Sequence, residues 1–352
     1  MQPPPRLISV LVVDDSVVAR RIVARALERD PEIARTDFAA NGVVALAKLA
    51  QRRPDVVVLD LEMPELDGFG TLTEIRRSHP ALPVVLFSSM EERVAAATLD
   101  ALSLGPTHFV LKPTVGTVDE AEAYVTAHVT PLVKALAAVG PERRPERRSD
   151  QPQSFREHPV TAVVVAVSTG GPDVLAAFVR ALPRDLPVPV LVVQHMPPVF
   201  TRLLAERLDR LGGPTVVEAQ DGDLVRRGQV LISPGDRHLA VVRTSTGVHV
   251  SLDDGPPENS CRPAADVLFR SAVTAWGGGV LAVVLTGMGH DGLRGAQAVR
   301  AAHGQVVVQD PATAVVGSMP AAVADAGLAQ AVLGIEDLAP AVVQRVTGKV
   351  VR

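Results

Sequence analysis

The sequence predicts an α/β protein built from two doubly wound parallel-sheet domains. Three observations lead to this prediction: a length of 352 residues, apolar runs that alternate with helical patterns, and a break in composition near the middle. At about 150 residues per domain, the length suits two domains. The apolar runs consist almost entirely of Val and Leu, which is typical of parallel strands buried on both faces with helices on either side.

The break in composition lies at residues 137–159, which read AAVGPERRPERRSDQPQSFREHP. This segment is rich in proline and charge and buries too little apolar surface to offset its ordering entropy. A flexible linker is therefore expected, although an exposed loop within one domain is the alternative. The expected organisation is a first domain over 5–136, a linker over 137–159 and a second domain over 160–350.

In the first domain, four apolar runs each precede a helical pattern. They are LISVLVV before 16–29, DVVVLD before 65–77, LPVVLFSS before 91–104 and THFVLK before 118–138. We expect five βα units here in all, with the run that ends at Asp60 as the third strand. In such a sheet, ligands bind outside the carboxyl ends of the strands.

In the second domain the alternation resumes. The expected pairs are VTAVVVAVS with a helix from Pro172, VPVLVVQH with a helix over 199–211, and GVLAVVLTG with a helix from Gly292. Between Gln229 and Leu252, short runs break at SPGD and STG, which predicts antiparallel hairpins. The second domain is thus expected to have a parallel core and a β-hairpin excursion.

Composition excludes several classes of function. Aromatic residues make up 3% of the chain and the net charge is −4, which argues against a nucleic-acid partner. The single cysteine, Cys261, excludes a disulfide framework and fits a reducing cytoplasm; we assign it no role. No apolar run reaches the 18 or so residues of a membrane span, so direct membrane insertion is not expected.

Polar residues mark the carboxyl ends of the first domain's strands. Asp14 and Asp15 end the first strand, Asp60 the third, Ser88 the fourth and Lys112 the fifth. Carboxylates that converge repel one another unless a hard cation neutralises them, and an all-oxygen ligand set favours Mg²⁺. Each residue alone could be a helix cap or a turn residue. Together they predict a pocket in which a carboxylate could carry a phosphoryl group.

These motifs (DD, LDLEMPELDG around Asp60, FSS and LKP) resemble a two-component receiver domain over residues 7 to about 130. The resemblance implies a flavodoxin-like fold and phosphorylation of Asp60 by a histidine kinase. It also implies a set of Mg²⁺ ligands, which are Asp14, Asp15, Asp60 and the main-chain carbonyl of Glu62.

The receiver resemblance further implies how phosphorylation would be transmitted. Ser88 and Lys112 would contact the phosphoryl group, and Phe109 stands where receivers carry a switch aromatic. Receivers usually have a cis peptide bond at the position of Lys112–Pro113. We attach no function to His108, whose position is often acidic in receivers.

Three residues with complementary chemistry follow strands of the second domain. Ser168 begins the turn STGGP, His195 follows LVVQ, and Asp291 lies in the glycine-rich VVLTGMGHDG. A serine nucleophile needs an imidazole to take its proton, and the imidazole needs a carboxylate to orient it. Taken alone, STGGP is more typical of a helix cap or an anion-binding turn. His290 is a weaker candidate than His195.

Two further interpretations of the second domain are not favoured by the sequence. His195, His238, His290 and Asp291 could form a metal site, but their spacing shows no metal-ligand pattern, so no cofactor is expected in this domain. The order Ser, His, Asp also differs from the Ser, Asp, His order of the α/β-hydrolases. An ordinary esterase of that fold is therefore not expected.

From residue 160 to about 325, the ordered strings VSTGGP, QHMP, ISPGDRHL, CRPAADVLFRSA, VVLTGMGHDG and QDPATAVVGSMP resemble the catalytic domain of chemotaxis protein-glutamate methylesterases. Members of this family also carry an N-terminal receiver. The resemblance implies a Rossmann-like fold, Ser168, His195 and Asp291 as catalytic residues, and main-chain amides of Thr169 and Met288 as oxyanion donors. One departure is Ala166, where many members have glycine.

The resemblance implies hydrolysis of glutamate γ-methyl esters on the cytoplasmic helices of chemoreceptors, with release of methanol, and deamidation of receptor glutamines. In the family, the unphosphorylated receiver blocks the catalytic face, and phosphorylation relieves the block. Two alternatives remain: a signalling adaptor without activity, and a receiver-controlled transcription factor. The Ser, His and Asp residues disfavour the first. The absence of a helix-turn-helix pattern or basic patch after the linker disfavours the second.

Overall fold

The computed structural model describes residues 7–88, 99, 107–113, 116–138 and 159–348. Contacts within the chain define two compact units, Met1–Arg143 and Arg144–Arg352. The segment that we predict as a linker, 137–159, lies almost entirely outside the described residues, so the domain bounds stay predictions. No helix in the described part of the chain is long and apolar enough to cross a membrane.

The first unit contains a five-stranded parallel sheet with the strand order β2-β1-β3-β4-β5. Its strands are β1 (Ile8–Val13), β2 (Ile33–Ala39), β3 (Val56–Asp60), β4 (Val84–Ser88) and β5 (Thr107–Leu111). The chain runs outward from β1 to β2, then returns to β3 on the other side of β1. This is the doubly wound fold that the sequence predicts, and its switch point lies between β1 and β3.

The helices of the first unit depart from the sequence prediction in two places. They are α1 (Val17–Glu28), α2 (Gly42–Gln51), α3 (Gly68–Ser78), α5 (Val118–His128) and α6 (Thr130–Ala138). The single helix expected over 118–138 is two helices that meet at Val129. Helix α3 begins at Gly68 rather than Glu65, because Glu65 has a positive φ of 67° and the Asp67 side chain caps the helix. The helix expected over 91–104 lies outside the described residues.

The second unit contains a seven-stranded parallel sheet with the strand order β14-β13-β12-β6-β7-β9-β8. Its strands are β6 (Ala162–Val167), β7 (Val190–Gln194), β8 (Thr215–Glu218), β9 (Gln229–Ile232), β12 (Val280–Val284), β13 (Gln305–Gln309) and β14 (Ala331–Leu333). From β6 the chain builds the sheet in one direction through β7, then crosses back to β12. The switch point therefore lies between β6 and β12, and the predicted doubly wound parallel fold is confirmed for this unit too.

The expected antiparallel region is only partly antiparallel. Strands β10 (His238–Thr244) and β11 (Gly247–Asp253) form the predicted hairpin. Strand β9, at the start of the same region, instead pairs parallel with both β7 and β8. Its four residues Gln229–Ile232 complete the main sheet, so the prediction of hairpins from Gln229 onward was wrong for this strand.

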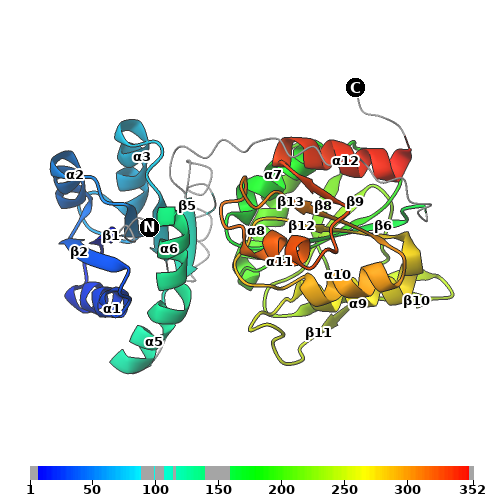
Figure 1. Cartoon of the computed structure of the whole chain (residues 1–352), viewed down its shortest axis with the longest axis horizontal. Coiled ribbons are helices and arrows are strands. Elements are labelled where there is room, and N and C mark those ends of the chain that lie inside the picture. Colours follow the sequence, from blue (N-terminus) through cyan, green and yellow to red (C-terminus); the bar gives the residue numbers. More distant parts are fainter. Residues whose placement is uncertain (1–6, 89–98, 100–106, 114–115, 139–158, 349–352) are drawn as a thin grey trace, which may run out of the picture. The chain divides into compact units, whose positions relative to one another are not determined.

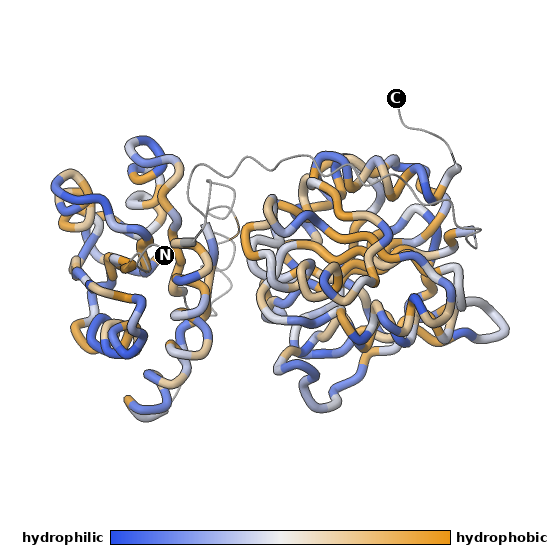
Figure 2. Tube along the Cα trace, viewed as in Figure 1, coloured by the Kyte–Doolittle hydropathy of each residue, from blue (hydrophilic) through white to orange (hydrophobic). Residues whose placement is uncertain are grey.

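Helices cover both faces of the second sheet. They are α7 (Gly171–Arg180), α8 (Pro198–Asp209), α9 (Ala265–Trp276), α10 (Leu293–Ala301), α11 (Ser318–Asp325) and α12 (Ile335–Thr347). Figure 1 shows α7 and α12 on one face of the strands and α9 and α10 on the other. The strands between them are strongly hydrophobic (Figure 2), and every residue of β6, β7, β12 and β13 is buried. This rigid core positions the loops at the carboxyl edge.

Candidate functional site

The first unit gathers three carboxylates at its switch point. One oxygen from each of Asp14, Asp15 and Asp60 lies within 4.8 Å of the other two. Asp14 and Asp60 are buried, at 3% and 2% exposure, whereas Asp15 is exposed. Main-chain amides orient the two buried groups: Ser16 N donates to Asp14 Oδ1 at 2.8 Å, and Glu62 N donates to Asp60 Oδ1 at 3.2 Å. A cluster of hard oxygen ligands at this spacing fits a divalent cation such as Mg²⁺.

Lys112 supplies the positive charge in this pocket. Its Nζ lies 2.7 Å from Asp60 Oδ2 and 3.0 Å from Asp14 Oδ2, and it also sits 5.9 Å from the centre of the Phe87 ring. Burial acts to lower the pKa of Lys112, but the two carboxylates raise it. Burial raises the pKa of Asp60, and Lys112 only partly offsets that rise. Lys112 therefore bridges two acids that would otherwise repel each other.

The structure gives fewer contacts for the other residues predicted for the first site, which are Ser88, Phe109 and Glu62. Ser88 ends β4 as expected, but its side chain lies outside what the structure describes. Phe109 on β5 is half-buried and packs against the apolar core. Glu62 follows β3 and is exposed. Among the described residues, the cis peptide bond is Arg262–Pro263 rather than Lys112–Pro113, so the implied cis bond at Lys112–Pro113 was wrong.

In the second unit, three neighbouring strands end at one place on the sheet edge. Strand β6 lies between β12 and β7 and leads into Ser168, while β7 leads into His195 and β12 into the loop 285–292 that contains Asp291. Main-chain bonds hold these ends together, with Ser168 N donating to Thr286 O at 2.9 Å and His195 N donating to Val167 O at 3.2 Å. The structure thus brings the three predicted catalytic residues to one edge.

Ser168 sits on a tight turn at the start of α7. Gly170 caps this helix with a positive φ of 78°, and a Cβ there would come within 2.7 Å of Val315. A second close approach lies at Gly287, whose missing Cβ would be 2.8 Å from the Cβ of Ser168. Gln194 Nε2 also donates to Ser168 O at 3.0 Å. Small residues therefore let the serine approach the β12 loop closely.

His195 and Asp291 form a buried hydrogen-bonded pair. Nε2 of His195 lies 2.8 Å from Asp291 Oδ2, so Nδ1 is the ring nitrogen that Asp291 leaves unbound. Burial acts to lower the pKa of His195, but hydrogen bonds with Asp291 and Cys261 outweigh burial and raise it. Burial acts to raise the pKa of Asp291, yet the interaction with His195 lowers it. This is the orientation and charge support that a general base requires.

Cys261 is a site residue that the sequence interpretation missed. The sequence gives it no role, but its side chain interacts with His195 and acts to raise the pKa of the imidazole. It ends a tight turn in which Glu258 and Cys261 exchange two main-chain hydrogen bonds, of 3.1 and 2.9 Å. The CRPAADVLFRSA string marks the segment, but nothing in the string indicates that its first residue reaches His195.

Two main-chain amides near Ser168 are free to donate. Among the described residues, Thr169 N and Met288 N make no hydrogen bond, whereas the neighbouring amides of Gly287 and Gly289 each donate one. Thr169 follows the serine directly, and Met288 follows Gly287, which the serine side chain approaches. Unpaired amides beside a nucleophile can stabilise a developing oxyanion.

The other histidines considered for the second unit do not join this site. His238 uses Nε2 to donate to Pro256 O at 3.1 Å and Nδ1 to accept from Ala264 N at 3.2 Å, so both ring nitrogens are engaged with the main chain. His290 is exposed on the loop beside Asp291. Neither geometry favours the metal-site interpretation over the Ser168, His195 and Asp291 arrangement.

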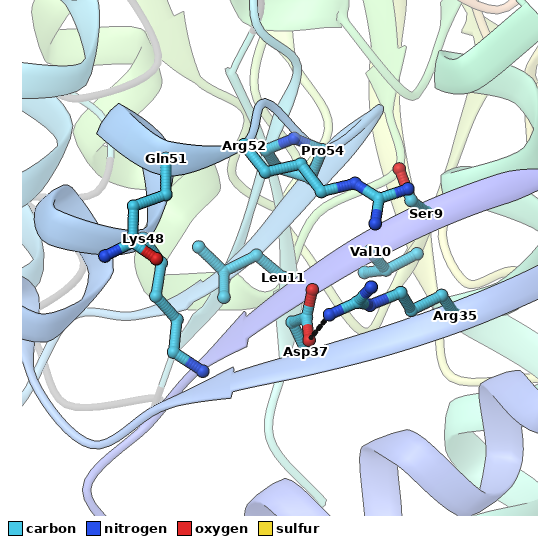
Figure 3. A pocket seen from close by; sticks show the side chains of 9 residues that line it. All are labelled: Ser9, Val10, Leu11, Arg35, Asp37, Lys48, Gln51, Arg52 and Pro54. Carbon is cyan, nitrogen blue, oxygen red and sulfur yellow. Dashed lines mark hydrogen bonds and ion pairs between the residues drawn. The ribbon is translucent and has the colours of Figure 1, made fainter.

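A separate pocket in the first unit holds none of the predicted residues. Figure 3 shows it between β1, β2 and the end of α2, where Arg35, Lys48 and Arg52 surround Asp37. Arg35 Nη2 pairs with Asp37 Oδ1 at 2.9 Å. The pocket reaches Ser9 at the amino-terminal half of β1, so it lies at the opposite end of the sheet from Asp60.

Comparison with known proteins agrees with this geometry. Residues 163–342 match the family model for the CheB methylesterase, and residues 10–121 match the model for the response regulator receiver domain. The crystal structure of the Thermotoga maritima CheB methylesterase catalytic domain is 40% identical and superposes with a TM-score of 0.52. The match covers 53% of this chain and 98% of that one.

Similarity to whole proteins extends over nearly the full length. A protein-glutamate methylesterase/protein-glutamine glutaminase from Nocardioides sp. is 46% identical over 351 residues, covering 96% of this chain and 95% of the relative. One with the same name from Trichodesmium erythraeum is 42% identical over 347 residues, covering 96% and 98%. The chain therefore belongs to the CheB methylesterase family, in the form that joins a receiver domain to the catalytic domain.

Proposed function

We propose that this protein is a phosphorylation-regulated serine hydrolase that removes methyl groups from glutamate γ-methyl esters of chemoreceptors and deamidates specific receptor glutamines. The observation that carries the proposal is the 2.8 Å bond between His195 and Asp291 at the strand end beside Ser168. The names of the full-length relatives supply the two reactions, on methylated glutamate and on glutamine side chains of proteins, and the family resemblance supplies chemoreceptors as those proteins. No cofactor is required for this chemistry in the second unit.

The first half of the reaction forms an ester with the enzyme. Ser168 Oγ attacks the side-chain carbonyl of the methylated glutamate as His195 Nδ1 takes the serine proton. Asp291 stabilises the imidazolium that results, and the amides of Thr169 and Met288 stabilise the oxyanion. His195 then returns the proton to the leaving oxygen, and methanol departs. Because the structure gives Ser168 Oγ and the imidazole no hydrogen bond, we expect the two groups to close together when substrate binds.

The second half of the reaction releases glutamate. Water gives a proton to His195 and attacks the acyl-enzyme, and His195 passes that proton to Ser168 Oγ as the ester bond breaks. With a glutamine substrate the same steps release ammonia in place of methanol. Both substrates thus yield a glutamate side chain on the receptor.

The first unit is proposed to regulate this activity. Asp60 would accept a phosphoryl group from a chemotaxis histidine kinase, with Lys112 offsetting its charge. Asp14, Asp15, Asp60 and the carbonyl of Glu62 would hold Mg²⁺, which supplies charge neutralisation to phosphoryl transfer when bound. Ser88 and Phe109 would couple the new dianion to a conformational change. Since the receptor helices are cytoplasmic, we place the protein in the cytoplasm.

The catalytic proposal is tested by methanol release from a methylated receptor fragment. Ser168→Ala should abolish release. Ser271→Ala is the matched control, because that hydroxyl bonds the main chain of α9 and should leave release unchanged. Equal release by wild type and Ser168→Ala would exclude the serine mechanism. If neither protein releases methanol, the alternative of an inactive signalling adaptor is favoured.

The regulatory proposal is tested with a small-molecule phosphodonor. Wild-type protein should release methanol faster when the donor and Mg²⁺ are present, whereas Asp60→Asn should keep the donor-free rate and lose the stimulation. Asp55→Asn, which changes a carboxylate that bonds Ser9 at the other end of the sheet, is the control and should still respond. Undiminished stimulation of Asp60→Asn would contradict the proposed phosphorylation site.

A further inference from the structure

The carboxylate of Asp291 does more than contact His195. Its Oδ2 accepts from Ala265 N at 2.6 Å as well as from the imidazole. Its Oδ1 accepts three further bonds, from Asp266 N at 3.1 Å, Gly292 N at 3.0 Å and Asn259 Nδ2 at 3.0 Å. Because Ala265 and Asp266 open α9, Asp291 serves as the cap of that helix, whose own cap residue, Ala264, has no side-chain acceptor.

Asp266 makes the reciprocal contact with α10. It is completely buried, and its Oδ1 accepts from Gly292 N at 3.0 Å and Gly295 N at 2.6 Å. Gly292 is the N-cap of α10 and likewise offers no side chain. Each carboxylate thus caps the helix near whose start the other residue lies: Asp291 caps α9, and Asp266 caps α10. This exchange fixes the backbone of Asp291 relative to α9.

The two buried carboxylates share two neutral donors, the main-chain amide of Gly292 and the side-chain amide of Asn259. Asn259 Nδ2 lies 2.9 Å from Asp266 Oδ2 and 3.0 Å from Asp291 Oδ1, so its two hydrogens are directed to the two acids. Burial and the charge of Asp291 raise the pKa of Asp266, whereas the Asn259 bond acts the other way. Asn259 itself is held at a positive φ of 53° by the turn between Glu258 and Cys261.

We infer that Asn259 and Asp266 are positioning residues that hold Asp291, and through it His195, in the orientation that hydrolysis needs. The inference rests on the proposed function, because it assigns these residues to the same reaction. Neither residue reaches the catalytic serine in this arrangement. Their effect passes through the Asp291 carboxylate, whose five donors fix both its charge and its direction.

The inference predicts opposite changes in two variants of the full-length protein. Asn259→Gly suits the positive φ and removes only the side chain, so the two carboxylates keep the shared Gly292 amide but lose the side-chain donor between them. We expect kcat for methanol release to fall about 10- to 100-fold with KM unchanged. The acid limb of the kcat profile should move to higher pH, because the added negative potential favours protonated His195.

Asp266→Asn removes a negative charge while keeping an oxygen for the amides of α10. The acid limb should therefore move to lower pH, and kcat should again fall. In the double variant the repulsion created by Asn259→Gly is absent, so its loss in kcat should be smaller than the product of the two single losses. Asp209→Asn is the matched control: Asp209 Oδ1 accepts from Val216 N at the end of α8 far from His195, so no shift is expected.

An NMR titration of the His195 ring separates this inference from the proposed function, since it needs no substrate. The imidazole signals are assigned by their loss in His195→Gln. Opposite pKa shifts in Asn259→Gly and Asp266→Asn support the positioning role, even in a protein that releases no methanol. An unshifted His195 in both folded variants overturns it, as does unchanged kcat in both. Thermal unfolding identifies a variant that fails to fold. In that case the direction of the His195 pKa shift in the other variant decides whether the positioning role holds.

Discussion

Both units of this protein place an aspartate at the switch point of a doubly wound sheet, but they treat its carboxylate in opposite ways. Asp60, at the end of β3, accepts one main-chain hydrogen bond and pairs with Lys112. Asp291, on the loop after β12, accepts five hydrogen bonds. Burial raises the pKa of Asp60, whereas the partners of Asp291 overcome burial and lower its pKa.

The contrast follows from what each carboxylate has to do. Asp60 is proposed to form a bond to phosphorus, so its oxygens need unused lone pairs. The cation beside them is Lys112, on a flexible side chain. Asp291 only orients an imidazole, so every lone pair can be used to fix it. One architecture therefore provides a reactive carboxylate or an inert one, according to how many donors the neighbouring loops supply.

The largest expected effect appears when Asp291 and Asp60 are each replaced by asparagine and the two variants are compared. Asp291→Asn presents an amide to donors from α9 and to His195, so the ring loses its orientation, and kcat for methanol release should fall about 10⁴-fold. Asp60→Asn should leave the donor-free rate unchanged. Steady-state methanol release from both variants tests this directly. A loss below about tenfold in Asp291→Asn would mean that the saturated carboxylate does not orient the base.

A smaller effect is expected from removing the cation of the first unit. Lys112→Met leaves Asp14 and Asp60 buried without a cationic partner, which should destabilise this unit by about 3 kcal/mol at neutral pH in EDTA. Mg²⁺ should restore much of the loss by binding the folded state. Since the folded-state pKa of Asp60 is already raised and would rise further, the deficit should shrink as the pH falls and Asp60 takes up a proton.

Urea unfolding can measure the Lys112 effect unit by unit. The single tyrosine, Tyr124, lies in the first unit and the single tryptophan, Trp276, in the second. Near-ultraviolet circular dichroism of the tyrosine should show the destabilisation, while tryptophan fluorescence should report an unchanged second transition. Equal stability of wild type and variant in EDTA, or a loss that Mg²⁺ does not reduce, would contradict the proposed charge balance.

Much of the fold and site could be predicted because the strands that lead to the sites, β3, β6, β7 and β12, are apolar until their last residue, and polar residues stand at or just after their ends. This places Asp60, Ser168 and His195 at sheet edges without knowledge of the sheet order. Strand β2 escaped a residue-level assignment because it is an edge strand, with polar residues along IARTDFA rather than an apolar run. Strand β9 was misassigned because a four-residue apolar run does not reveal whether its partners are parallel.

The site residues that escaped prediction lie on a turn rather than after a strand. Asn259 and Cys261 reach the catalytic pair because positive φ angles at Asn259 and Ser260 fold the chain back on itself. Neither hydrophobic periodicity nor strand-end position marks such residues. The Asp266 carboxylate lies on α9, and its donors Asn259 and Gly295 lie on this turn and on α10. Their convergence depends on tertiary packing, such as the close contact of Gly295 with Phe269.

The smallest expected effect concerns Cys261, which interacts with His195 in the second site. Lys112 forms an ion pair with Asp60, whereas the side chain of Cys261 interacts with His195 and acts to raise the pKa of the imidazole. Because the base must be neutral to accept the serine proton, kcat/KM should rise with pH through the His195 pKa, which lies above its ordinary value of about 6.5. Cys261→Ala should move this limb to lower pH and leave the alkaline plateau nearly unchanged. Cys261→Ser, which keeps a polar atom beside the ring, should move it less, whereas an upward shift in either variant would show that the thiol does not favour the protonated imidazole.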